Sequence, residues 1–147
     1  MKETVPEVAL APFAALVGNW MTEATHVALE DVIRGWVQFE WLAGARFLVQ
    51  RSETDHPDVP DALGVIGLME GDQDLSMQYF DSRGVHRIYR IAFDGSELQI
   101  WRDAPGFAQR STARLSPDGS TLEGSWELNE NGKGFRHDMT ISYRRVV

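Results

Sequence analysis

The chain changes its hydrophobic pattern once, just before residue 19. Ahead of that point Phe13 and Leu16 lie three residues apart, while Pro12 suits a first helical turn and Gly18 suits a helix end. From Asn19 onward, apolar and polar residues alternate with a period of two, which is typical of strands that bury one face. The pattern therefore predicts one short N-terminal helix followed only by strands.

Turn signals divide the alternating region into ten predicted strands. They are residues 19–27, 31–42, 45–53, 62–70, 74–80, 85–93, 97–102, 107–115, 121–129 and 134–145. Asp94-Gly95 and Asn131-Gly132 are strong hairpin signals, and a sheet of this many strands tends to close because closure removes its edges. A chain of 147 residues fits one domain. The prediction is an all-β, ten-stranded antiparallel up-and-down barrel over residues 1–147.

The face that alternation turns inward mixes aromatic with polar and charged side chains. An unpaired guanidinium in a sealed core costs several kcal/mol, so we expect a hollow barrel that holds water or a ligand. The tryptophans, Tyr89 and Phe107 are expected in the walls, and the two arginines with Gln109 around a polar head. The predicted ligand-binding residues are Trp20, Tyr79, Arg87, Tyr89, Arg102, Phe107, Gln109, Trp126, His137 and Tyr143. His26 is also placed on the inward face.

Composition narrows the classes of partner. The formal net charge of −8 argues against nucleic acid and against an anionic membrane surface, since both require a concentrated basic face. The chain has no cysteine, which excludes disulfides, thiolate metal sites and cysteine nucleophiles. The apolar run at residues 8–18 lacks a basic flank and is too short to span a bilayer, so we expect a cytoplasmic protein.

Two features resemble the calycin superfamily, which includes the lipocalins and the fatty-acid-binding proteins. Gly18-Asn19-Trp20 opens the first predicted strand, and Arg144 or Arg145 ends the last one. In calycins the tryptophan packs across the closed end of the barrel under the arginine. Such stacking is physically favourable, because a guanidinium lies well on an indole ring and donates to nearby carbonyls.

Three further segments resemble a family of small bacterial proteins of unknown function that have a lipocalin-like barrel. They are residues 79–85, 102–110 and 124–127. This likeness implies the barrel fold and carries no substrate with it.

The resemblance to fatty-acid-binding proteins suggests a ligand. Those proteins hold a carboxylate inside the barrel with arginine and tyrosine, and Arg87, Arg102 and Tyr143 are suited to similar work. The favoured function is therefore the binding of a small hydrophobic, amphipathic or anionic molecule. The alternative for the two arginines is that they pair with an internal acid such as Glu127 or lie on the outer face.

A second reading is a haem protein. Nitrobindin-like barrels use a histidine on the last strand as axial iron ligand, and His137 lies comparably. Those proteins open with a glycine-rich segment around the tryptophan, whereas Trp20 here is followed by Met21-Thr22-Glu23-Ala24. A histidine satisfied by a hydrogen bond within the barrel is the simpler interpretation of His137.

The third reading is an enzyme, and it has the least support. The chain contains no G-x-S-x-G, no H-E-x-x-H and no glycine-rich phosphate loop. His137 and Asp138 are adjacent on one strand and are expected on opposite faces, which leaves Glu127 near Arg110 as a candidate acid or base. A binding protein is favoured over a catalyst.

Two surface features complete the predictions. The loop at residues 54–61 contains His56 among acidic residues, and we expect a solvated loop rather than a metal site. Its prolines suit a stiff lid over the barrel mouth. Trp36 and Leu48 are expected to face outward, as candidates for a homodimer surface.

Overall fold

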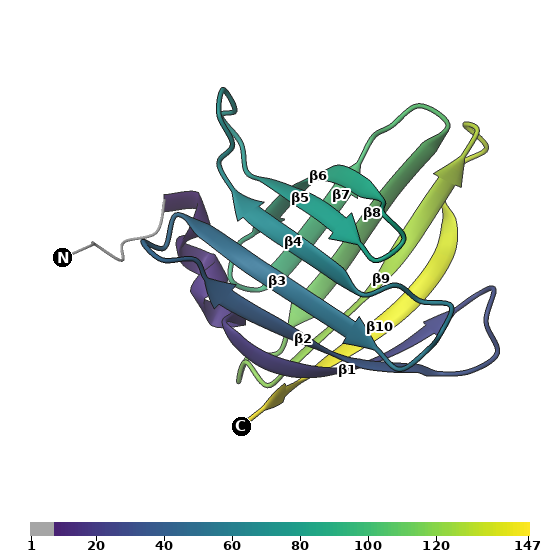
Figure 1. Cartoon of the computed structure of the whole chain (residues 1–147), viewed down its shortest axis with the longest axis horizontal. Coiled ribbons are helices and arrows are strands. Elements are labelled where there is room, and N and C mark those ends of the chain that lie inside the picture. Colours follow the sequence, from purple (N-terminus) through teal and green to yellow (C-terminus); the bar gives the residue numbers. More distant parts are fainter. Residues whose placement is uncertain (1–7) are drawn as a thin grey trace.

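The computed structural model describes residues 8–147 and shows a closed antiparallel barrel of ten strands, with one short helix at one end of the barrel (Figure 1). The strands are β1 (Gly18–His26), β2 (Ile33–Trp41), β3 (Phe47–Thr54), β4 (Ala62–Gly67), β5 (Ser76–Asp81), β6 (His86–Phe93), β7 (Glu97–Arg102), β8 (Phe107–Leu115), β9 (Thr121–Glu130) and β10 (Arg136–Val146). The predicted fold class is confirmed, and the largest difference in a strand boundary is the end of β4. Of the helices among the described residues, none is long and apolar enough to cross a membrane.

Strands that follow one another in the sequence are neighbours in the barrel, and β1 pairs with β10 to close it. This closing ladder runs from Asn19 opposite Val146 to His26 opposite Met139. Closure leaves no strand with an unpaired edge, which is why a sheet of ten strands can stand alone. At the β9–β10 hairpin, Asn131 and Gly132 have φ of 56° and 71°, the left-handed pair that a tight turn between twisted strands requires.

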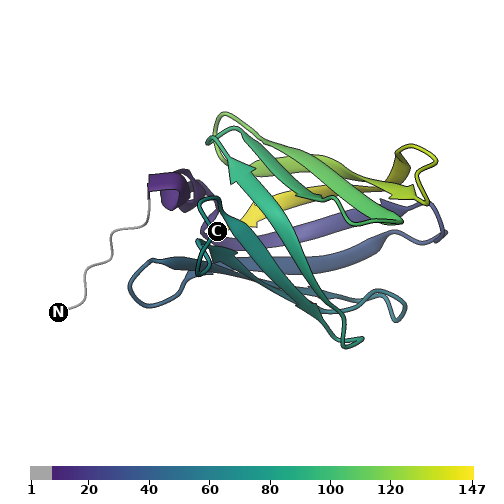
Figure 2. The same cartoon turned by 90° about the horizontal axis from the view of Figure 1, so that it is seen from above.

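The helix η1 (Val8–Leu16) covers one end of the barrel (Figure 2). Leu10, Phe13 and Leu16 are fully buried, and the ring of Phe13 meets that of Phe93 edge to face at 5.5 Å. The sequence placed Pro12 in the first turn, whereas η1 is a 3-10 helix that already begins at Val8. Burial of Leu10 against the barrel explains why the helix extends ahead of the proline.

The tryptophan–arginine contact expected from the calycin resemblance is present at this closed end, and the arginine is Arg145. Its guanidinium lies 4.2 Å from the centre of the Trp20 ring, and the indole N–H donates to the carbonyl of Leu16 at 2.9 Å. Arg145 also donates to three backbone carbonyls, those of Ala15, Val17 and Gly119. One side chain thus ties β10 to the helix and to the β8–β9 turn.

The structure corrects one predicted surface residue. Leu48 is fully buried in the core, whereas Trp36 is 40% exposed on the outer face of β2. On β3 the inward positions are Leu48 and the alternate residues after it, so Gln50, Ser52 and Thr54 line the interior. Alternation does not distinguish the two faces at Leu48-Val49, because both residues are apolar and both are buried.

Candidate functional site

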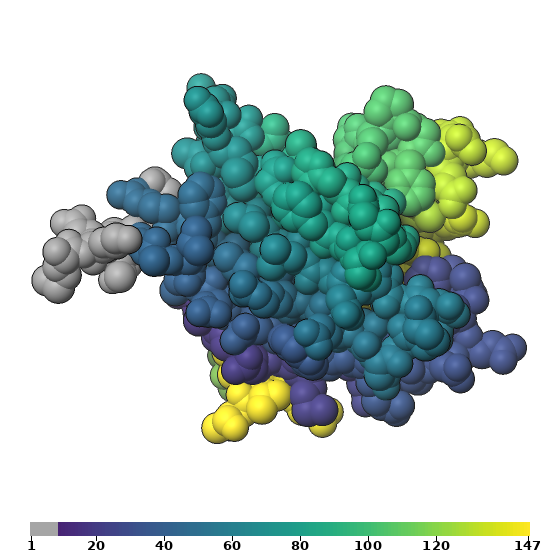
Figure 3. Space-filling view, viewed as in Figure 1, coloured from purple at the N-terminus to yellow at the C-terminus, as the bar shows by residue number. Residues whose placement is uncertain are grey.

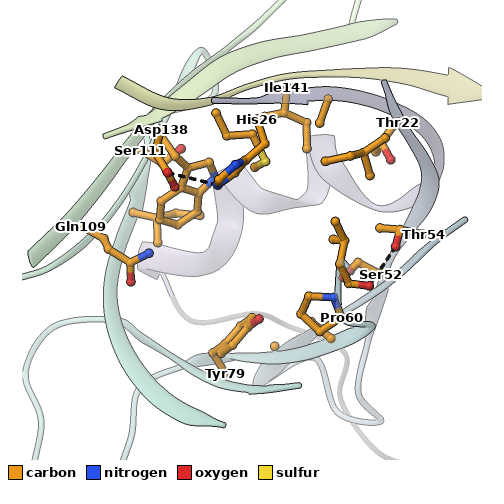
Figure 4. A pocket seen from close by; sticks show the side chains of 18 of the residues that line it. Thr22, His26, Ser52, Thr54, Pro60, Tyr79, Gln109, Ser111, Asp138 and Ile141 are labelled. Carbon is orange, nitrogen blue, oxygen red and sulfur yellow. Dashed lines mark hydrogen bonds and ion pairs between the residues drawn. The ribbon is translucent and has the colours of Figure 1, made fainter. Parts of the chain in front are cut away.

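The interior of the barrel is a cavity of about 720 Å³, to which all ten strands contribute lining residues. Loop residues Val27, Ala28, Val59 and Pro60 also line it, which places the mouth at the end opposite η1. Figure 4 looks into this cavity with the helix behind it, and Figure 3 shows the barrel wall closed by side chains over β3 and β4. A volume of this size falls within the range of about 300–1,000 Å³ typical of small-molecule sites.

The charged side chains that line the cavity lie at its mouth, and the deeper part is lined by uncharged side chains. Leu98 and Ile100 lie on β7, with Leu98 near its closed-end start, and Met77 lies near the closed-end start of β5. The charged lining residues Arg87 and Asp138 belong to the ends of β6 and β10 that reach the mouth. A molecule with a hydrocarbon body and a polar head would match this arrangement.

Arg87 stands on the inner face of β6 without an acidic partner. Its guanidinium lies 5.0 Å from the centre of the Phe107 ring, and its Nη1 donates to Oε1 of Gln109 at 3.4 Å. The hydroxyl of Tyr89 donates to the same oxygen at 2.8 Å. Within residues 8–147, no carboxylate forms an ion pair with Arg87. The guanidinium and the Gln109 NH₂ group therefore keep donor capacity toward the cavity.

Tyr143 and Tyr79 both face the cavity but differ in what their hydroxyls do. Burial alone raises the pKa of Tyr143 to about 12, and no hydrogen bond within the described chain contributes. The hydroxyl of Tyr79 donates to Asp81 at 2.8 Å, and burial together with this bond raises the pKa of Tyr79 above its usual value. Hydrogen bonds from the Arg83 side chain hold the pKa of Asp81 well below its usual range. The Tyr143 hydroxyl is thus a free donor at neutral pH, whereas the Tyr79 hydroxyl is bound to Asp81 at the end of β5.

A bulge in β10 changes which residues face inward at the mouth. The pairing with β9 shifts between His137, which is opposite Glu127, and Met139, which is opposite Trp126. One extra residue in a strand reverses the alternation beyond it, so Arg136 and Asp138 line the cavity. His137 was predicted to face inward, but it is exposed on the outer face, 3.1 Å from the Thr140 hydroxyl. In this position it cannot ligate a haem iron inside the barrel.

Most of the predicted ligand-binding residues lie together. The cavity is lined by Tyr79, Arg87, Tyr89, Phe107, Gln109, Trp126 and Tyr143. Trp20 does not line it, because its ring is fully buried under Arg145 at the closed end. Arg102 is half-buried at the last position of β7 and is not a lining residue.

Two other predictions concerned acids and metals. Glu127 pairs with Arg110 on the outer face, with Oε1 3.0 Å from Nε, so it neither neutralises Arg87 nor reaches the cavity. Among the described residues, no group of three or more His, Cys, Asp or Glu side chains is arranged to hold a metal ion. His56 instead accepts the backbone N–H of Asp58 at 3.1 Å within its own loop.

The loop after β3 folds over the rim of the mouth (Figure 4). The Thr54 hydroxyl donates to the carbonyl of Val59 at 3.2 Å, and the Thr54 N–H donates to the carboxylate of Asp61 at 3.2 Å. These bonds hold Val59 and Pro60 where they line the cavity. The rim is therefore partly covered by a loop that is fixed by its own polar contacts.

Comparison with known proteins yields a fold and no family. No protein-family model matches the chain, and no curated protein matches it by sequence. Among solved structures, Rv2717c from M. tuberculosis matches with a TM-score of 0.68 at 14% identity, over 97% of this chain and 100% of that one. The S-type phycobiliprotein lyase CPES from Guillardia theta matches with a TM-score of 0.55 at 10% identity, over 92% and 90%. Both are calycin-like barrels, and at these identities the likeness shows that this chain has a calycin-type fold.

Proposed function

We propose that this protein binds an amphipathic molecule inside the barrel, with an anionic group at Arg87 and an apolar body toward η1. The observation that carries the proposal is a half-buried arginine that lines the cavity with no carboxylate among the described residues paired to it. A partly buried guanidinium is stabilised by an anion, and it can bind a carboxylate or phosphate through two parallel hydrogen bonds.

The surroundings of Arg87 support an anionic rather than a cationic ligand. Gln109 uses its carbonyl oxygen for both Arg87 and Tyr89, which leaves its NH₂ group to donate. The free hydroxyl of Tyr143 lies deeper and keeps its proton at neutral pH. Barrels of this build enclose ligands in the lipocalins, and a phycobiliprotein lyase shares the fold.

The test is a displacement titration with two ligands of equal chain length. The fluorescent anion 1-anilinonaphthalene-8-sulfonate is bound first and is then displaced by dodecanoate or by dodecan-1-ol. Arg87→Gln should weaken dodecanoate binding about tenfold or more, because it removes a charge-assisted hydrogen bond. Binding of dodecan-1-ol should change little.

Arg90→Gln is the matched control variant. Arg90 lies on the same strand but on the outer face, where it pairs with Asp72 at 3.6 Å, so its loss changes the net charge equally. It should leave the affinity for dodecanoate unchanged. Equal dodecanoate affinity in the wild type and in Arg87→Gln would overturn the proposal, as would a failure of every amphiphile to bind.

A further inference from the structure

The bulge in β10 carries a carboxylate into the cavity on the wall away from Arg87. Asp138 Oδ1 lies 3.1 Å from Nε2 of His26, and the two side chains are only 22% and 29% exposed. Figure 4 shows both side chains turned into the barrel, with their contact drawn. Bulges next to binding sites commonly re-aim a side chain, and here the bulge exchanges His137 for Asp138 at the mouth.

His26 holds the carboxylate of Asp138 in place. The backbone N–H of Ala28 donates to Nδ1 of His26 at 3.0 Å, so Nε2 is the ring nitrogen that faces Asp138 Oδ1. His26 therefore orients the carboxylate and leaves further lone pairs of Asp138 open to the cavity.

Apart from the exposed Glu53, the other charged side chains that line the mouth are paired. Arg136 Nη2 lies 2.8 Å from Glu130 Oε1, and Arg83 Nη2 lies 2.6 Å from Asp81 Oδ2. Glu53 belongs to an outward-facing position of β3 and is exposed. Among the described residues, the cavity is left with one guanidinium that has no acidic partner, Arg87, and one inward-facing carboxylate that no arginine or lysine pairs with, Asp138.

Arg87 and Asp138 lie on opposing walls. β6 and β10 are four strands apart in a closed ring of ten, and the two side chains form no ion pair with each other. A ligand that carried only an anionic group would satisfy Arg87 and leave Asp138 facing it as a like charge. Half-buried charges are costly without a partner of opposite sign.

We infer that the ligand has a zwitterionic head, with an anionic group at Arg87 and an ammonium group at Asp138. The inference rests on the proposed function of the cavity and names the class of its ligand. An ammonium group supplies both the positive charge and the hydrogen-bond donors that the free lone pairs of Asp138 accept.

The experiment compares dodecyl phosphate with dodecylphosphoethanolamine, which adds an ammonium group two carbons beyond the phosphate. Both are titrated below their micellar concentrations by displacement of the same fluorescent anion. The wild type should bind dodecylphosphoethanolamine about tenfold more tightly than dodecyl phosphate, the gain of one charge-assisted contact.

Asp138→Asn should change the affinities for the two probes differently. The asparagine oxygen can still accept from His26, so the variant removes the charge and keeps the shape. Affinity for dodecylphosphoethanolamine should fall about tenfold, while affinity for dodecyl phosphate should not fall, because a like charge has been removed. Misfolding would weaken both probes together and cannot produce this pattern.

Glu127→Gln is the control, since Glu127 lies on the outer face, opposite His137 in the β9–β10 ladder, and loses the same charge. It should alter neither affinity. Equal binding of both probes by the wild type, or an equal effect of Asp138→Asn on both, would overturn the zwitterionic head. In that case the sensitivity of dodecyl phosphate to Arg87→Gln decides separately whether the proposed anion site stands.

Discussion

The two ends of the barrel differ in how completely the chain satisfies the hydrogen-bond donors of an arginine. At the closed end, Arg145 stacks on Trp20 and donates to three backbone carbonyls. At the mouth, Arg87 has one hydrogen bond of 3.4 Å to a side-chain amide and an aromatic ring beside it. The first guanidinium is satisfied by the chain, whereas the second keeps donors that only water or a ligand can use.

The same division holds for the apolar side chains. Leu10, Phe13, Leu16 and Trp20 are fully buried where η1 closes the barrel. The lining of the cavity also includes half-buried residues such as Trp126 and Phe107, which face the open space of the barrel. Packing of the closed end should therefore supply stability, and the mouth should supply binding with little contribution to stability.

The strongest test removes one large side chain from the closed end and another from the outer face of the barrel. Phe13→Ala should lower the free energy of unfolding by about 3–5 kcal/mol, because it leaves a cavity in a fully packed cluster. Phe80→Ala is the matched control: Phe80 is 43% exposed on the outer face and should cost at most about 1 kcal/mol. Urea unfolding measures both, and equal losses would show that η1 does not anchor the fold.

A second test compares neighbouring arginines at the closed end. Arg145→Met should cost about 2–3 kcal/mol, because it leaves carbonyls unpaired and removes the stacking on Trp20. Arg144→Met removes the exposed side chain of the preceding residue. Its free energy of unfolding should lie within about 0.5 kcal/mol of the wild-type value. Thermal and urea unfolding of both variants give the comparison. A similar loss in both would mean that net charge matters here and the contacts of Arg145 do not.

The contact at the closed end could be predicted because its residues carry the resemblance to the calycins. That resemblance implied stacking between Trp20 and Arg144 or Arg145, and the structure shows it at Arg145, while the Asn131-Gly132 turn set one hairpin. Alternation then placed Arg87 and Gln109 on the inner face, since the period of two is unbroken along β6 and β8.

At the mouth, the inward-facing residues of β10 were predicted wrongly because regular alternation breaks there. Nothing in the segment around Asp138 marks a bulge, so alternation placed His137 inside and Asp138 outside, the reverse of the structure. The pairing of His26 with Asp138 joins the end of β1 to the start of β10, a contact that spans nearly the whole chain. Such contacts depend on the register of barrel closure, which one sequence does not state.

The smallest expected effect concerns stability at the mouth and depends on pH. Asp81 accepts hydrogen bonds from Tyr79 and from the backbone and side chain of Arg83 in the turn after β5. Asp81→Asn should lower the free energy of unfolding by about 1 kcal/mol at pH 7, because the ionised carboxylate is the better acceptor.

The pKa of Asp81 is lowered in the folded state, so the stability that its carboxylate contributes is present above the unfolded pKa of about 3.9. As pH falls below that value, the unfolded chain takes up a proton first, and the difference between wild type and variant should narrow. Urea unfolding at pH 7 and pH 3 measures it, with Asp72→Asn on the outer face as control. A difference that stays constant between the two pH values would show that the ionisation of Asp81 does not stabilise the turn.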